Sequence, residues 1–203
     1  MLSDTYLTMA KPSEGLFKEK GSKFLSFAFP VRNEEEIKVI LAGIRKEHYA
    51  ARHCCFAWSL GPGQERFRIN DDGEPSGTAG RPIYGQMVSN NLNNVLLVVV
   101  RYFGGTLLGV SGLIQAYKQA AADAINNAEI LTQTIEQLFD IYFEYSAMND
   151  LMLMIKEEHL EIVYSNFDLQ CRLSLRVRLS RVMGIKEKIG KIEGVITLKT
   201  RED

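Results

Sequence analysis

Apolar residues recur along the chain with two spacings, one typical of helices and the other of strands. Residues 34–48 and residues 111–126 have apolar positions three and four apart, which predicts two amphipathic helices. Residues 53–60 and 95–102 are apolar at nearly every position, so they predict strands covered on both faces, as in a layered α/β sheet. Residues 16–31 contain two extended runs around a Gly-Ser pair, which predicts a hairpin.

Shorter elements follow the second helix. Their expected order is strand 131–145, helix 147–158, strand 161–166, strand 168–179, helix 181–189 and strand 195–200. This β-α-β-β-α-β order predicts a ferredoxin-like domain, with a tight hairpin at Asn166. A chain of 203 residues also exceeds the usual size of one domain, roughly 100–150 residues. We therefore expect an α+β protein with two domains, residues 1–129 and residues 130–203.

The charge of the chain is almost balanced, with 24 basic and 25 acidic residues, so nucleic-acid binding would need a local patch. The apolar runs are too short to span a membrane and the first residues lack the pattern of a signal peptide, which predicts a cytoplasmic protein without membrane contact. Cys54, Cys55 and Cys171 are odd in number and two are adjacent. They predict reduced, buried thiols rather than disulfides or zinc ligands, and we assign no cofactor.

Residues 70–82 are rich in glycine, proline and acids, which predicts a loop before a short helix at 83–89. The candidate binding groups of this loop are Asp71, Asp72, Glu74, Ser76, Gly77, Thr78 and Arg81. The three carboxylates could hold Mg²⁺ or Ca²⁺, although Pro75 excludes an EF-hand. Alternatively, backbone amides from Ser76 to Gly80 could bind an anion beside Arg81. In a third interpretation the acids only cap neighbouring backbone amides.

A second glycine-rich segment, residues 101–112, leads from a buried strand into a helix. Its candidate residues are Arg101, Tyr102, Gly104, Gly105 and Ser111. In open α/β sheets ligands bind at this position, yet the segment matches neither a dinucleotide fingerprint nor a P-loop. The glycines could instead pack the helix onto the sheet. His53 could act as a general base or a proton-sensitive contact, although no nucleophile motif accompanies it. We predict that both segments meet in one polar cleft.

Arg172, Arg176 and Arg178 alternate with apolar residues and therefore share one face of a strand. A row of arginines on an open sheet could contact RNA phosphates. It could equally form a solvated face neutralised by acids on neighbouring strands, an interpretation favoured by the lack of a matching aromatic pair for base stacking.

Four segments resemble the YigZ/IMPACT family. They are GSKFLSFAFPV at 21–31, ARHCCFAW at 51–58, DDGEPSGTAGRPI at 71–83 and VVVRYFGGTLLGVSGLIQAY at 98–117. The resemblance covers residues 21–128. It departs from the family at Cys54, where bacterial relatives often have a second histidine, and at Ser111, where a glycine is usual but a helix N-cap is still possible.

The resemblance implies a first domain with the βαβ fold of the second domain of a small-subunit ribosomal protein, shared with kinases of the galactokinase type. It implies a second domain like the last domain of elongation factor G. Family members are associated with translation, and the eukaryotic ones restrain an amino-acid-starvation kinase through its activator with an additional N-terminal domain.

Three hypotheses follow. The first is a non-enzymatic binding protein that contacts the ribosome, RNA or a translation factor. The second is an enzyme acting on a small phosphorylated or otherwise anionic substrate, with His53 and the acidic loop as its chemical groups and a possible divalent metal. In the third, the glycine-rich loops are purely architectural.

Overall fold

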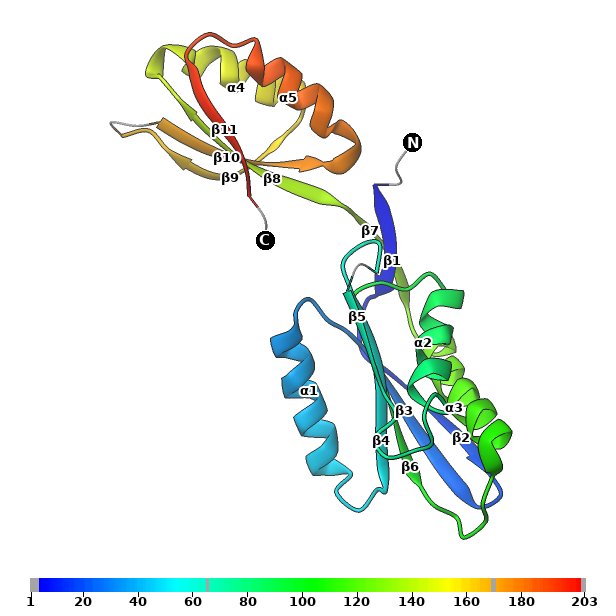
Figure 1. The fold of residues 1–203 in the computed structure, drawn as a ribbon. Helices are drawn as coiled ribbons and strands as arrows, with labels where there is room; N and C mark the ends of the chain where they lie inside the picture. The colour runs from blue at the N-terminus through cyan, green and yellow to red at the C-terminus, as the bar shows by residue number, and fades with distance from the viewer. Residues whose placement is uncertain (1–3, 65, 169–170, 202–203) are drawn as a thin grey trace. The chain divides into compact units, whose positions relative to one another are not determined.

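The computed structural model describes residues 4–64, 66–168 and 171–201 and contains two compact units (Figure 1). Residues 6–133 form the first unit. Residues 4–5 and the described residues from 134 onwards form the second. Helices and sheets occur in both, so the protein is α+β. Among the residues described, no helix is long and apolar enough to cross a bilayer.

The first unit contains a five-stranded sheet. Its spatial order is β2 (Ser13–Glu19), β3 (Ser22–Pro30), β6 (Val95–Tyr102), β4 (His53–Leu60) and β5 (Arg66–Asn70). Every neighbouring pair is antiparallel, so the rule for open parallel α/β sheets, from which ligand binding at residues 101–112 was expected, does not apply to this sheet. The apolar sequence of β6 does not reveal the direction of the neighbouring strands. A strand covered on both faces is apolar throughout whether its neighbours are parallel or antiparallel.

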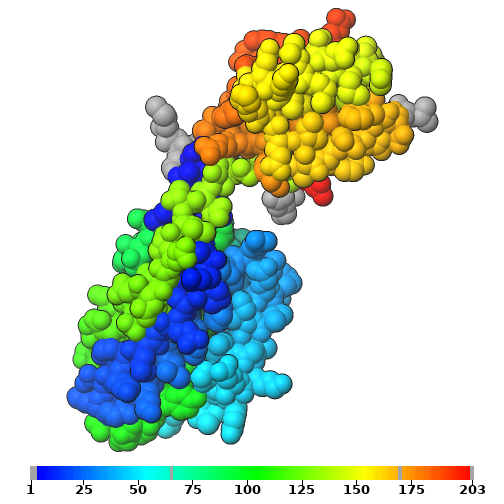
Figure 2. Space-filling model, turned by 180° about the vertical axis from the view of Figure 1, so that it is seen from behind, coloured from blue at the N-terminus to red at the C-terminus, as the bar shows by residue number. Residues whose placement is uncertain are grey.

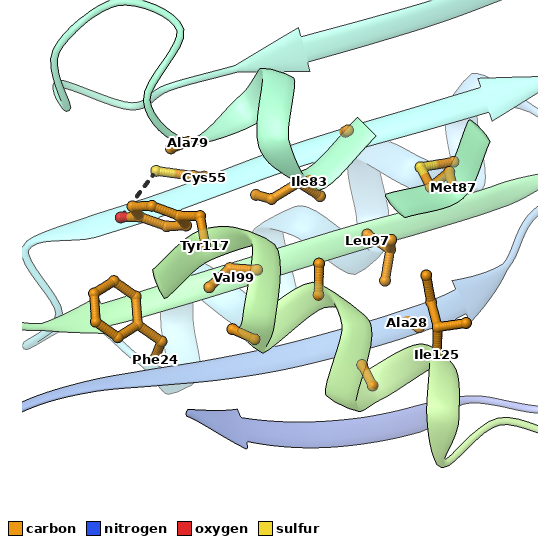
Figure 3. Packing of buried hydrophobic residues seen from close by; sticks show 14 of the residues in the cluster. Phe24, Ala28, Cys55, Ala79, Ile83, Met87, Leu97, Val99, Tyr117 and Ile125 are labelled. Carbon is orange, nitrogen blue, oxygen red and sulfur yellow. Dashed lines mark hydrogen bonds between the residues drawn. The ribbon is translucent and has the colours of Figure 1, made fainter. Parts of the chain in front are cut away.

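Three helices cover the two faces of this sheet (Figure 1). They are α1 (Glu34–Glu47) on one face, and α2 (Gly80–Ser89) and α3 (Gly109–Asn126) on the other. Alternate residues of β6 face opposite ways. Leu96 and Val98 pack in the α1 layer with Trp58, whereas Leu97 and Val99 pack in the other layer, part of which Figure 3 shows. Helix α1 begins where expected, because Asn33 accepts a hydrogen bond from the Glu36 N–H at 2.9 Å.

Two helices begin earlier than predicted. Helix α2 starts at Gly80, which places Arg81 in its first turn and not in the loop. Helix α3 starts at Gly109 with Leu108 in the capping position, so Ser111 lies inside the first turn and is not the N-cap. Both helices begin within glycine-rich sequence. Because glycine is a poor helix former, the sequence did not predict that the helices begin there.

The second unit has the element order β-α-β-β-α-β. Its elements are β8 (Glu136–Phe143), α4 (Met148–Glu157), β9 (Glu161–Asn166), β10 (Cys171–Arg178), α5 (Val182–Gly190) and β11 (Val195–Arg201), with short 3₁₀ turns at Tyr145–Ala147 and Leu179–Arg181. The strands lie in the order β11-β8-β10-β9, all antiparallel, and α4 and α5 cover one face (Figure 1). The hairpin expected at Asn166 includes residues 169–170, which lie outside the described residues.

The single strand expected at 131–145 is wrong. It divides into β7 (Ile130–Thr134) and β8, and β7 pairs with β1 (Thr5–Met9) in a separate two-stranded sheet (Figure 1). In the space-filling view the blue N-terminal segment lies against a yellow-green segment (Figure 2). Ile135, between the two strands, donates its N–H to the Asp4 carbonyl oxygen at 2.6 Å and accepts from the Leu179 N–H at 2.9 Å. At this residue the backbone stops pairing with β1 and begins pairing with the strands of the second sheet. The alternation of apolar and polar residues in the sequence does not reveal this change.

Candidate functional site

The two glycine-rich segments meet at a cavity of about 340 Å³ in the first unit. Its lining residues are Arg52, His53, Gly73, Glu74, Pro75, Arg101, Phe103, Leu107, Leu108, Gly109, Val110 and Leu113. The acidic loop supplies one side, and the segment that enters α3 supplies the other. His53 and Arg101 lie opposite each other on the paired strands β4 and β6, which places both side chains beside the two loops.

Glu74 lies at the centre of a buried polar network beneath this cavity. Its Oε1 accepts hydrogen bonds from Arg101 Nη1 at 2.7 Å and from the Tyr117 hydroxyl at 2.7 Å, and lies 3.8 Å from His53 Nε2. The side chains of Glu74 and Arg101 are 3% and 7% exposed. A buried ion pair of this kind holds its partners firmly, because losing either one leaves the other charged and unpaired.

Tyr117 and Cys55 extend the network into the core (Figure 3). The Cys55 thiol is the donor toward two oxygens, the Asp71 carbonyl at 3.0 Å and the Tyr117 hydroxyl at 3.4 Å, which share its one proton. Burial, and to a smaller extent the neighbouring Cys55 and Glu74, raise the pKa of Tyr117 far above its usual range. Burial likewise raises the pKa of the Cys55 thiol. Both groups therefore stay protonated and serve as hydrogen-bond donors.

The orientation of His53 is fixed by the acidic loop. Its Nδ1 lies 2.8 Å from the carbonyl oxygen of Asp72. Because a carbonyl oxygen only accepts hydrogen bonds, Nδ1 carries the proton in the neutral ring and Nε2 is left as an acceptor. That nitrogen lies on the side of Glu74. An acceptor nitrogen at a cavity is one of the features that a general base requires.

Asp71 binds the backbone of its own loop. Its Oδ1 accepts from the N–H groups of Ala79 at 3.0 Å and Gly80 at 2.8 Å, and its Oδ2 from that of Gly77 at 2.9 Å. Burial alone would raise its pKa, but these bonds and the charge of Arg81 outweigh it, so the pKa of Asp71 lies below the usual range. Three of the amides expected to bind an anion, those of Gly77, Ala79 and Gly80, therefore already bind the protein's own carboxylate.

Asp72 is also bound internally. Its Oδ2 accepts from the Cys54 N–H at 2.7 Å, and its Oδ1 pairs with Arg45 at 3.0 Å. Each of the three loop carboxylates thus binds a different protein group. In the part of the chain that the structure describes, no three His, Cys, Asp or Glu side chains are grouped to hold a metal ion. The capping interpretation of the sequence therefore describes Asp71 and Asp72 best.

Several predicted residues lie apart from the cavity. Thr78 is buried and its hydroxyl donates to the Pro75 carbonyl at 2.7 Å, whereas Ser76, Arg81 and Ser111 are exposed. Tyr102 points to the other face of the sheet, where its hydroxyl lies 3.0 Å from His48 Nδ1.

Two predicted glycines have structural roles. A Cβ on Gly104 would overlap the backbone of Gly21 and Ser22, so only glycine allows the β2–β3 turn to pack there. Gly105 has a φ of 87°, in the left-handed region that favours glycine.

Sequence reasoning missed the apolar rim of the cavity. Leu107 is 83% exposed, Val110 60% and Phe103 42%. It also missed the partner of Glu74, because Tyr117 fits the apolar pattern of its helix. A tyrosine buried on such a face usually needs a partner for its hydroxyl, and this is the signal that could have identified it.

The arginines of β10 lie on the sheet face that α4 and α5 leave uncovered. Arg172 pairs with Asp140 at 2.8 Å, Arg176 pairs with Glu161 at 3.0 Å, and Arg178 is exposed. Acids on neighbouring strands thus neutralise part of the row. The expectation that no aromatic pair accompanies it is wrong: the rings of Tyr142 and Tyr164 lie 5.6 and 5.2 Å from the Arg172 guanidinium.

Comparison with known proteins gives matches over both units. A family model, the Impact N-terminal domain, matches residues 20–125. The IMPACT family member YigZ of Escherichia coli (strain K12) is 31% identical over 178 residues, which cover 87% of this chain and 86% of YigZ. An IMPACT family member of Thermus thermophilus is 36% identical over 159 residues, covering 77% and 84%. The crystal structure of a hypothetical protein, 27% identical, superposes with a TM-score of 0.73 over 100% of this chain and 98% of that one.

Proposed function

Because this chain belongs to the IMPACT family, we propose that it is a translation-associated regulatory protein that binds a partner through the Glu74 cavity. The partner is a component of the ribosome or a translation factor, and the site of action is the cytoplasm. The observation that carries this proposal is a buried, internally paired floor, formed by Glu74, Arg101 and Tyr117, below an exposed apolar rim.

The bonding of the acidic loop supports binding better than metal-dependent chemistry. Asp71 and Asp72 are taken up by protein groups, so they have a structural use that a metal site would have to disrupt. A network held this way is preorganised, which lowers the entropy lost when a partner docks.

The rim of the cavity indicates what enters it. Leu107, Val110 and Phe103 present apolar surface around an opening, and grouped exposed apolar side chains mark interaction sites. A volume of about 340 Å³ lies near the lower end of the roughly 300–1,000 Å³ of ligand sites. The cavity therefore suits one apolar side chain of a partner protein rather than a long polymer.

The domain relationships are part of the proposal. We propose that the first unit has the βαβ fold of the ribosomal-protein domain and galactokinase-type kinases, and that the second has the ferredoxin-like fold of the last domain of elongation factor G. The crossover from β3 through α1 to β4 supports the first relationship. The strand order β11-β8-β10-β9 supports the second. Fold likeness alone does not assign a function, so the cavity has to be tested directly.

Co-sedimentation with ribosomes at low and moderate salt tests the proposal. The full chain should appear in the ribosomal fraction, and Leu107→Asp or Val110→Asp should remove most of it, because each places a charge in an apolar contact. Val39→Asp is the matched control, since Val39 is 73% exposed on α1, on the opposite face of the sheet. Absence of the intact chain from the ribosomal fraction, or equal loss with all three variants, refutes the proposal.

The fixed orientation of His53 favours a second candidate, an enzyme acting on a small anionic substrate. Arg52 and Arg101 line the same cavity and supply positive charge near Nε2. Release of p-nitrophenol from p-nitrophenyl phosphate, measured with and without Mg²⁺, tests this candidate. Turnover that His53→Gln abolishes while Trp58 fluorescence stays native would support it, and turnover unaffected by that change would refute it.

A further inference from the structure

The open face of the second unit's sheet carries aromatic and basic side chains together. Tyr142 on β8 and Tyr164 on β9 flank Arg172 on β10, with ring centroids 5.6 and 5.2 Å from its guanidinium. Tyr142 lies opposite Arg172 and Tyr164 lies opposite Ser174, two residues further along β10, so the two tyrosines flank Arg172 diagonally. The result is a π-surface made of two rings and one guanidinium across three strands.

This surface is held in place from below. Asp140 accepts hydrogen bonds from Arg172 Nη2 at 2.8 Å and from Ser174 Oγ at 2.5 Å. Asp140 and Ser174 are 8% and 1% exposed, whereas Tyr164 is 47% exposed. The guanidinium is therefore fixed by buried groups, while the half-exposed Tyr164 remains accessible to a stacking base.

Positive charge surrounds the π-surface. Lys199 on β11 lies 5.5 Å from the Tyr142 ring, and the register places Lys199 opposite Asp140 and Arg201 opposite Leu138 on this face. With Arg172, Arg176 and Arg178, five basic side chains stand against three acidic ones, Glu136, Asp140 and Glu161. Within the described ranges, Arg178, Lys199 and Arg201 form no ion pair with a carboxylate.

We propose that this face binds single-stranded RNA, with bases stacked on Tyr142, Arg172 and Tyr164 and phosphates contacted by Lys199 and Arg201. Single-stranded nucleic acids are bound by this combination of aromatic or guanidinium stacking surfaces with a basic track. A duplex keeps its bases stacked inside and offers nothing to the tyrosines. The choice of RNA over DNA rests on the proposed function, since RNA is the nucleic acid of translation.

Fluorescence anisotropy of a labelled single-stranded oligouridine with the full chain tests the stacking contact. Tyr164→Ala should weaken binding by about 5- to 150-fold, the usual effect of removing one stacked aromatic. Tyr164→Phe keeps the ring and should stay within about twofold of the wild type. Tyr145→Ala is the matched control, because Tyr145 is 73% exposed in the turn after β8 and lies off the sheet.

The salt dependence tests the phosphate contact. Lys199→Ala should reduce the slope of log affinity against log salt by about 0.7, the value for one phosphate contact with a single strand. Lys191→Ala, which removes a lysine paired with Glu187 on the helical side, should leave the slope unchanged.

Three outcomes overturn the inference: no binding at low salt, equal effects of Tyr164→Ala and Tyr145→Ala, or equal affinity for the corresponding oligodeoxynucleotide. Ribosome co-sedimentation that depends on Leu107, without tyrosine-dependent RNA binding, refutes this inference and leaves the proposed function standing. Tyrosine-dependent RNA binding without Leu107-dependent co-sedimentation supports the RNA surface and refutes the proposed use of the cavity.

Discussion

Replacing Asp71 by alanine should destabilise the first unit, because this side chain closes the loop before α2. The carboxylate accepts three backbone hydrogen bonds, from the N–H groups of Gly77, Ala79 and Gly80. The residue that caps α2, Ala79, has no side chain able to accept a hydrogen bond from the first turn. Asp71 performs that task from eight residues earlier in the chain.

The size of the effect follows from which of the three donors water can reach. Gly77 is partly exposed, so water replaces the carboxylate there. Ala79 and Gly80 are buried, and an unsatisfied buried donor costs about 1–3 kcal/mol. Asp71→Ala should therefore lower the free energy of unfolding by about 2–6 kcal/mol, a large part of the 5–15 kcal/mol of a typical domain. Asp71→Asn keeps one acceptor oxygen and should lose about 1–3 kcal/mol.

Urea unfolding followed by tryptophan fluorescence measures this effect selectively. Trp58 is the only tryptophan of the chain, and it is buried in β4 of the first unit. Its signal therefore reports that unit alone. Glu35→Ala is the control. Glu35 is exposed and its ion pair with Lys38, at 4.0 Å, contributes less than about 1 kcal/mol.

The pH dependence provides a second measurement. Because the pKa of folded Asp71 is below its usual range, the stabilisation is fully present above the unfolded pKa of about 3.9. It is lost as the pH falls through the lower folded pKa. The difference in stability between wild type and Asp71→Asn should thus shrink below about pH 4. A loss under about 1 kcal/mol for Asp71→Ala, or a difference that grows in acid, would contradict the capping role.

Three further changes probe the rest of the network. Gly104→Ala should disrupt the first unit, because the added Cβ would overlap the backbone of Gly21 and Ser22. Gly85→Ala adds a Cβ that meets nothing within 4 Å, so it should be neutral or stabilising. Equal melting temperatures of the two variants would contradict this. Arg101→Met should cost about 3–5 kcal/mol. Adding Glu74→Gln, which removes the unpaired charge and keeps an acceptor for the Tyr117 hydroxyl, should restore much of it in the same urea assay; no recovery would mean that the two charges are uncoupled. Cys55 should react with a thiol reagent only after unfolding, because burial raises its pKa; rapid labelling of the native protein would contradict this.

The local sequence pattern predicted most of the helices and strands. It failed where contacts between distant residues determine where a helix starts or how strands are oriented. The helix at 34–47 and the strand at 53–60 carry their own caps and periodicity, so both were placed within one residue. The start of α2 depends on Asp71, which is separated from it by a loop, and no local rule connects the two. Similarly, the direction of β6 relative to its neighbours is a property of the whole sheet.

The candidate site was predictable only in part. Polar residues in glycine-rich loops pointed to Glu74, His53 and Arg101 as neighbours, because such loops pack little and carry function. Their internal pairing was not predictable, since a carboxylate that binds a metal and one that caps an amide have the same sequence signature. The tyrosines of the second sheet were missed for a similar reason. Tyr142 and Tyr164 are on different strands, and only the register brings them to Arg172.

The position of β6 has a consequence for synthesis of the chain. β3 and β4, its neighbours on either side, are both made earlier, and about 35 residues separate the end of β4 from the start of β6. At roughly 5–20 residues per second the ribosome needs about 2–7 s for that interval. During this time a nascent chain exposes two apolar strand edges with no strand between them, which is a target for chaperones and for aggregation.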